Sequence, residues 1–121
     1  MSYDVVIAPG REAHISKVLE GLKPDESQGV DEALADLETV GHASDEAAGN
    51  WHYDGTSHEI GVVPAPNAPH VTIITSSQTG SREIQVHDIL TAGTDHARKA
   101  APGISSKSLD LGPNRHWEAI P

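Results

Sequence analysis

The sequence contains no cysteine and no phenylalanine, and its only aromatic residues are Tyr3, Trp51, Tyr53 and Trp117. The lack of cysteine excludes disulfides, thiol nucleophiles and zinc sites with thiolate ligands. With so few rings, the core has to be built from Val, Ile, Leu and Ala side chains. A chain of 121 residues is still long enough to bury such a core, and we expect a single domain over residues 1–121.

Long apolar runs are missing as well. No stretch has the apolar length of a membrane-spanning helix, and the segment MSYDVVIAPG lacks the basic start and apolar length of a signal peptide. From these absences we expect a cytoplasmic protein.

Basic residues are scarce, with 8 Lys and Arg against 18 Asp and Glu and a formal net charge of −10 at pH 7. A field of this sign repels nucleic-acid phosphates and anionic lipids, so we expect neither nucleic acid nor membrane as a partner. It favours a basic protein partner, although an acidic surface can equally serve solubility or tolerance of high salt. Between residues 24 and 50 there is no Lys or Arg and there are eight acids: Asp25, Glu26, Asp31, Glu32, Asp36, Glu38, Asp45 and Glu46.

The most regular pattern lies between His58 and Leu90, where three runs of β-branched residues alternate with other residues. Such alternation is typical of half-buried antiparallel strands. The segments PAPNAP (64–69) and SSQTG (76–80) separate the runs and are rich in turn-forming residues. We therefore expect a three-stranded meander whose paired apolar positions are Ile60 with Val62, Val71 with Ile73, and Ile84 with Val86.

Shorter segments predict further strands. Residues 3–8 form an apolar run that Pro9-Gly10 ends, and Asp54-Gly55 predicts a hairpin turn within residues 50–63. Leu109 and Leu111 have strand spacing, and residues 115–120 are expected to form a last edge strand.

Three segments predict helices. Residues 11–22 carry an apolar stripe at helical spacing, and so do residues 30–40, which we expect to follow a loop over 24–29. Residues 41–49 are expected to form a loop. The third helix is expected over 88–101, with Asp88 as its N-cap, or from Thr94 only, and in both cases it ends at Pro102-Gly103. This order of elements predicts an α+β fold, an antiparallel sheet of about 5–6 strands with two or three helices packed on one face.

The second predicted helix carries its acidic residues off the apolar stripe, without Lys or Arg partners four positions away. An acidic surface of this kind steers a basic partner, and partly exposed tryptophans are common anchors in interfaces. Asn50-Trp51-His52 and His116-Trp117-Glu118 mirror each other and form one aromatic patch if their strands are neighbours. The candidate partner-binding residues are Asp31, Glu32, Asp36, Glu38, Asp45, Glu46, Trp51 and Trp117.

The chain also has eight histidines, the residue type used most often as a metal ligand and general base. Their spacing matches no known metal motif, and there is no GxSxG segment of a serine hydrolase. His52, Asp54 and His58 fall in one predicted hairpin, so they and His116 are the candidates for a metal or acid–base site. No other cofactor is expected.

Three functional hypotheses remain open at this point. The first is a non-enzymatic protein that covers a basic surface of a partner, in the manner of an inhibitor or immunity protein. The alternative is a small enzyme or ligand-binding protein whose His/Asp site, with or without a metal, lies near Trp51 and Trp117. The third is a homo-oligomer that forms by pairing of an exposed strand edge.

Overall fold

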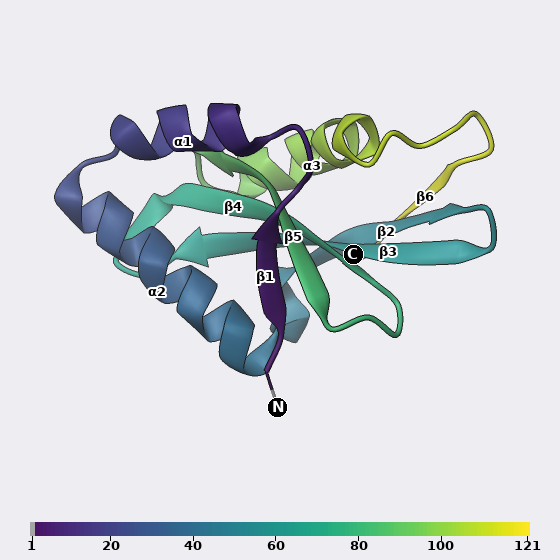
Figure 1. Ribbon diagram of the computed structural model, residues 1–121, viewed down its shortest axis with the longest axis horizontal. Helices are drawn as coiled ribbons and strands as arrows, with labels where there is room; N and C mark the ends of the chain where they lie inside the picture. Colours follow the sequence, from purple (N-terminus) through teal and green to yellow (C-terminus); the bar gives the residue numbers. More distant parts are fainter. Residues whose placement is uncertain (1) are drawn as a thin grey trace.

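The computed structural model describes residues 2–121 and confirms the predicted α+β fold, with three α-helices packed on a six-stranded, mostly antiparallel sheet (Figure 1). No helix among these residues is long and apolar enough to cross a membrane. In chain order the elements are β1 (Asp4–Ile7), α1 (Glu12–Glu20), α2 (Pro24–Val40), the 3₁₀ helix η1 (Ser44–Glu46), β2 (Ala47–Tyr53), β3 (Thr56–Ala65), β4 (Ala68–Gln78), β5 (Glu83–Leu90), α3 (Thr94–Ser108) and β6 (His116–Ala119).

The strands lie in the order β1-β5-β4-β3-β2-β6. The predicted meander is confirmed as β3, β4 and β5, but the linkers predicted over 64–69 and 76–80 are too long, because the strands leave only residues 66–67 and 79–82 between them. All pairs are antiparallel except β1 with β5. Asp54 and Gly55 have positive φ angles of 50° and 73°, which fit the predicted two-residue hairpin turn between β2 and β3. The sheet therefore has β1 and β6 as its two edges.

Apolar side chains from neighbouring positions divide between the two faces of the sheet. Val63 and Ile73 pack with α1 and α2, whereas Val62 and Ile74 pack with α3. Because successive strand residues point to opposite faces, α1 and α2 cover one face and α3 covers the other. Two of the helices thus share a face as predicted, and the third lies on the opposite side.

The loop predicted over 24–29 is wrong, because α2 begins at Pro24. Proline is compatible with the first helical turn, where its missing N–H would have no partner. The backbone N–H of Lys23 donates to Glu26 Oε1 at 2.8 Å, which fixes the helix start. Gly29 is buried against Ala65 and Pro66, where an added Cβ would lie 2.6 Å from the Pro66 carbonyl oxygen. Close packing of α2 on the turn after β3 therefore requires glycine inside the helix.

The predicted end of the third helix at Pro102-Gly103 is also wrong. β5 continues to Leu90, so Asp88 is no N-cap, and α3 begins at Thr94 and continues through Pro102 to Ser108. Ala97, Ala101 and Ser105 form a buried row at helical spacing against the sheet. This packing stabilises the helix across the proline, and the strand predicted at Leu109 and Leu111 is absent from the described residues.

The segment predicted as a loop over 41–49 contains η1 and the start of β2, which begins at Ala47. Gly49 explains part of this extension. An added Cβ there would lie 2.5 Å from the Trp117 ring and 2.6 Å from the Glu118 carbonyl oxygen. Glycine thus lets β6 pair closely with β2.

Candidate functional site

α2 exposes the four acids that were predicted to bind a partner, and Asp25 in its first turn is exposed as well. Figure 1 shows α2 lying across one side of the sheet, and the residues opposite its buried stripe are exposed. Over residues 2–121, no Lys or Arg lies within 4.0 Å of any of these four carboxylates. The structure therefore places Asp31, Glu32, Asp36 and Glu38 together on one helix without an ion-pair partner.

Glu26 differs from the other acids of this segment, because it is buried and paired. It accepts hydrogen bonds from the backbone N–H of Lys23 and from the ring of His70. These two contacts, the first more than the second, hold the pKa of the Glu26 carboxyl below its usual value. Glu26 thus stabilises the start of α2 and is not part of the exposed acidic surface.

An apolar groove borders this acidic surface between α2 and β3. Its volume is about 200 Å³, and Val40 at its rim is 69% exposed. Asp36 of α2 and Glu46 of η1 line the same groove. Glu46 Oε1 accepts the Ala43 N–H at 2.7 Å, which holds this carboxylate at the groove. The apolar walls are formed by Ala33, Leu37, Val40, Val63, Pro64 and Pro66.

Asp45 and Glu46 line a neighbouring pocket, which β3 and α3 complete. Arg98 of α3 donates to the backbone carbonyl oxygens of Asp45 at 2.7 Å and Ala47 at 3.1 Å. It thereby holds η1 in place, but it forms no ion pair with either carboxylate within 4.0 Å over residues 2–121. Both acids therefore keep their negative charge available beside the groove.

The strands of the two mirrored segments are neighbours, so Trp51 of β2 pairs with Trp117 of β6, with ring centroids 5.2 Å apart. The pair of His52 and His116 lies on the opposite face of the sheet, so the indoles and imidazoles do not form one patch. Trp51 is only 7% exposed and donates its indole N–H to Ser105 Oγ at 2.8 Å. It packs on the α3 side of the sheet, whereas α2 lies on the other side. Trp51 is thus a core residue, and the tryptophans do not belong to one surface with the acids of α2.

The four histidine-site candidates do not converge on one point. His52 and His116 stack with ring centroids 6.2 Å apart, and Glu118 Oε1 lies 3.8 Å from His52 Nε2. His58 lies on the opposite face, where it stacks on Tyr53 and partial burial lowers its pKa. Asp54 is exposed in the hairpin turn. Within residues 2–121, no three His, Asp or Glu side chains are arranged to hold a metal ion.

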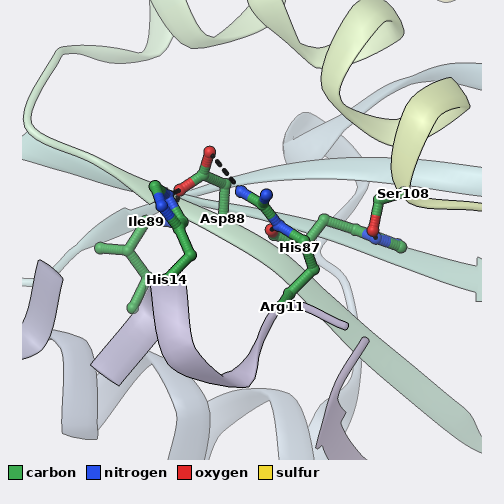
Figure 2. Close-up of polar contacts among 6 residues, drawn as sticks. All are labelled: Arg11, His14, His87, Asp88, Ile89 and Ser108. Atoms are coloured by element: carbon green, nitrogen blue, oxygen red, sulfur yellow. Dashed lines mark hydrogen bonds and ion pairs between the residues drawn. The ribbon is translucent and has the colours of Figure 1, made fainter. Parts of the chain in front are cut away.

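The sequence suggested the neighbours His87 and Asp88 as a possible metal-binding pair, but it did not reveal the polar cluster that Asp88 forms with Arg11 and His14 at the end of β5 (Figure 2). β1 ends opposite Val86, and beyond it Arg11 donates from Nε to the His87 carbonyl oxygen at 2.8 Å. Arg11 also binds Asp88 Oδ2 at 3.1 Å, and the His14 ring lies 2.9 Å from Asp88 Oδ1. The Asp88 side chain is only 10% exposed, and its charge is compensated by Arg11, which precedes α1, and by the ring of His14 in α1.

His87 belongs to a second buried network on the α3 side. Its Nε2 lies 2.6 Å from Ser76 Oγ and its Nδ1 lies 2.7 Å from Ser108 Oγ. Burial and the nearby Arg11 guanidinium lower the pKa of His87 to about 4, so the ring is neutral at pH 7. His87 follows Val86 in β5 and therefore points to the opposite face of the sheet from Ile84 and Val86. No sequence signal showed that α3 would cover that face.

A third network connects His42 with two strands. His42 Nδ1 lies 3.1 Å from Glu59 Oε1 and its Nε2 lies 2.6 Å from Thr75 Oγ1. This order resembles a nucleophile–base–carboxylate triad, but Thr75 is fully buried and cannot meet a substrate. Gly61 beneath the ring provides the space for it, because an added Cβ would lie 2.8 Å from His42 Nε2. The network therefore holds residue 42 against the sheet.

The chain matches no protein-family model, and the searches of curated proteins and of solved structures found no match either.

Proposed function

We propose that this protein binds a basic segment of a partner protein through the groove between α2 and β3 and the acidic surface beside it. The observation that carries the proposal is the combination of apolar walls with two carboxylates, Asp36 and Glu46, in one groove. Lys and Arg side chains have an apolar stem and a charged head, so their stems fit such walls while their heads meet the carboxylates.

Other acids of α2 contribute at longer range. Asp31, Glu32 and Glu38 add exposed negative charge to the same helix, and over residues 2–121 none of them forms an ion pair. Charge of one sign on one surface raises the association rate of an oppositely charged partner and makes that rate depend on ionic strength. The binding energy itself then comes from the desolvated contacts inside the groove.

Within this proposal, the finer role is that of an inhibitor or immunity-type protein that acts in the cytoplasm. A partner that binds nucleic acids or other phosphates has a basic surface, and an acidic protein that covers this surface blocks its natural ligand.

The proposal is tested by affinity capture from the source cells with three immobilised proteins. These are the wild type, the double variant Asp36→Asn/Glu46→Gln, and Asp54→Asn as a matched control. Asp54 is exposed in the β2–β3 hairpin, away from the groove, and asparagine suits its positive φ angle. We expect a basic protein that is retained by the wild type and by the control but lost from the double variant.

Calorimetry with the captured protein then supplies the affinity. We expect the double variant to bind at least about tenfold more weakly than the wild type, as for lost charge-assisted contacts. Equal retention by all three proteins, or capture only of proteins that are not basic, would contradict the proposal.

A further inference from the structure

A second pocket lies between the segment that precedes α1 and the end of α3. Its volume is about 400 Å³, within the range of small-molecule sites. Pro9, Gly10 and Arg11 line one side, and Ile104, Lys107 and Ser108 of α3 line the other. In a chain with 8 Lys and Arg against 18 acids, two basic residues at one pocket stand out from the general charge.

The hydroxyl group of Ser76 fixes the position of the proton on His87. Ser76 is 2% exposed, and within residues 2–121 its Oγ has a single hydrogen-bond partner, the Nε2 atom of His87. A buried hydroxyl that does not donate its hydrogen costs about 1–3 kcal/mol, so Ser76 donates to Nε2. Nε2 is then the acceptor nitrogen of the neutral ring, and the proton is on Nδ1.

This tautomer determines what the Ser108 hydroxyl does. His87 Nδ1–H donates to Ser108 Oγ over 2.7 Å, so the hydrogen of the Ser108 hydroxyl is not used by His87. Across the described part of the chain, Ser108 Oγ has no other hydrogen-bond partner. Figure 2 shows Ser108 at the end of α3 beside the His87 ring. Ser108 therefore presents a hydroxyl donor at the pocket that it lines.

Two cationic groups flank this donor. Arg11 uses its Nε and one N–H of Nη2 for the His87 carbonyl and Asp88, which leaves further guanidinium donors available. Lys107 is exposed and forms no ion pair within 4.0 Å over residues 2–121. Asp88 compensates much of the Arg11 charge, so Lys107 contributes the uncompensated positive charge of the pocket.

From this arrangement we infer that the pocket between α1 and α3 binds the phosphate group of a small molecule through Arg11, Lys107 and the Ser108 hydroxyl. A guanidinium, an ammonium and a hydroxyl donor on two sides of one pocket match the several acceptor oxygens of a phosphate. The apolar side chains of Pro9 and Ile104 leave room for a short carbon group attached to it. This site is separate from the groove between α2 and β3.

Phosphate binding is tested by titration of the full chain at pH 7 and low salt, followed by NMR of the Gly10, Lys107 and Ser108 amides. One arm uses inorganic phosphate and the other glycerol phosphate. Both are expected to saturate the same amides with a Kd of about 1 mM or tighter. A tighter Kd for the ester identifies a phosphorylated small molecule as the ligand, and a tighter Kd for inorganic phosphate identifies the free ion. If neither inorganic phosphate nor glycerol phosphate saturates these amides, the inference is overturned.

Three variants locate the contacts. Lys107→Gln and Ser108→Ala are each expected to weaken binding by roughly tenfold, as for a lost hydrogen bond to a charged group. Lys99→Gln removes an equal charge from an exposed position of α3 that does not line the pocket, and it should leave the Kd unchanged. Equal weakening by Lys99→Gln and Lys107→Gln would show a general charge effect and overturn the site.

The tautomer of His87 is tested separately in the wild type. Correlation of the ring protons with the ring nitrogens shows which nitrogen carries the proton. We expect the proton on Nδ1, with or without phosphate. A proton on Nε2 would turn the Ser108 hydroxyl toward His87 and overturn its assigned role as a donor to the ligand.

Discussion

Asp88 and Asp36 each line a pocket, yet their surroundings are opposite. Asp88 is 7% exposed and accepts from Arg11, from the ring of His14 and from the backbone N–H of Ile89. Asp36 is exposed on α2 and has no ion-pair partner within 4.0 Å over residues 2–121. The same type of side chain thus has several hydrogen-bond donors around it in one region and no ion-pair partner in the other.

This difference separates charges that support the fold from charges that are available to a partner. Removing a buried carboxylate leaves its hydrogen-bond donors without an acceptor, which lowers the free energy of unfolding. Removing an exposed one changes stability little and can even reduce repulsion between like charges. The end of β5 should therefore be sensitive to pH and mutation, and the outer surface of α2 should be tolerant.

Protonation of His87 gives the largest expected effect. The folded-state pKa of His87 is lowered from 6.5 to about 4, so between these values the unfolded state binds more protons. The contribution of neutral His87 to the free energy of unfolding is complete above pH 6.5. It is lost as the pH falls toward 4, and the total loss is on the order of 3 kcal/mol. Urea unfolding between pH 7.5 and 4 measures this loss. A free energy of unfolding that stays constant down to pH 5 would contradict the prediction.

The matched pair Asp88→Ala and Asp36→Ala tests the comparison directly. We expect Asp88→Ala to lower the free energy of unfolding by about 2 kcal/mol, because Arg11, His14 and the Ile89 N–H lose their acceptor. Asp36→Ala should stay within about 0.5 kcal/mol of the wild type, since alanine also favours the helix. Equal effects in the two variants, measured by urea unfolding at pH 7, would remove the distinction between the two regions.

The smallest expected effect concerns salt. Repulsion among the exposed acids of α2 is screened by ions, so raising NaCl should stabilise the protein by less than about 1 kcal/mol. The variant Glu32→Gln/Asp36→Asn should show a weaker response, because these two residues are four positions apart on the helix. Thermal unfolding at low and high salt measures both responses. A stronger response in the variant would mean that the acids of α2 do not repel one another.

Much of the sheet could be predicted because its pattern is local. Alternating β-branched residues and the Asp54-Gly55 turn specify strands and a hairpin within a few residues of each other. The errors at 24–29 and 102–108 arise where tertiary packing outweighs local preference. Residue 29 must be glycine because Pro66 packs closely against it. Pro102 is tolerated inside α3 because the buried side chains of Ala101 and Ser105 hold the helix against the sheet. Neither partner is visible in the local sequence.

The candidate sites were predictable to different degrees. The acidic surface of α2 follows from helical periodicity, and the pairing of Trp51 with Trp117 follows from mirrored segments. The network of Ser76, His87 and Ser108 could not be predicted, because its members come from two strands and a helix and share no spacing rule. A sequence pattern shows which face of an element is polar, but it does not show which other element will cover that face.

The parallel pairing of β1 with β5 has a consequence for folding during synthesis. Asp4 pairs with Glu83, so most of the chain has to leave the ribosome before β1 finds its neighbour. Contacts that are so distant in sequence form slowly, since a long loop has to close first. Until then Val5 lacks the strand against which it packs, so the apolar side chains of β1 stay in solvent while the rest of the sheet forms.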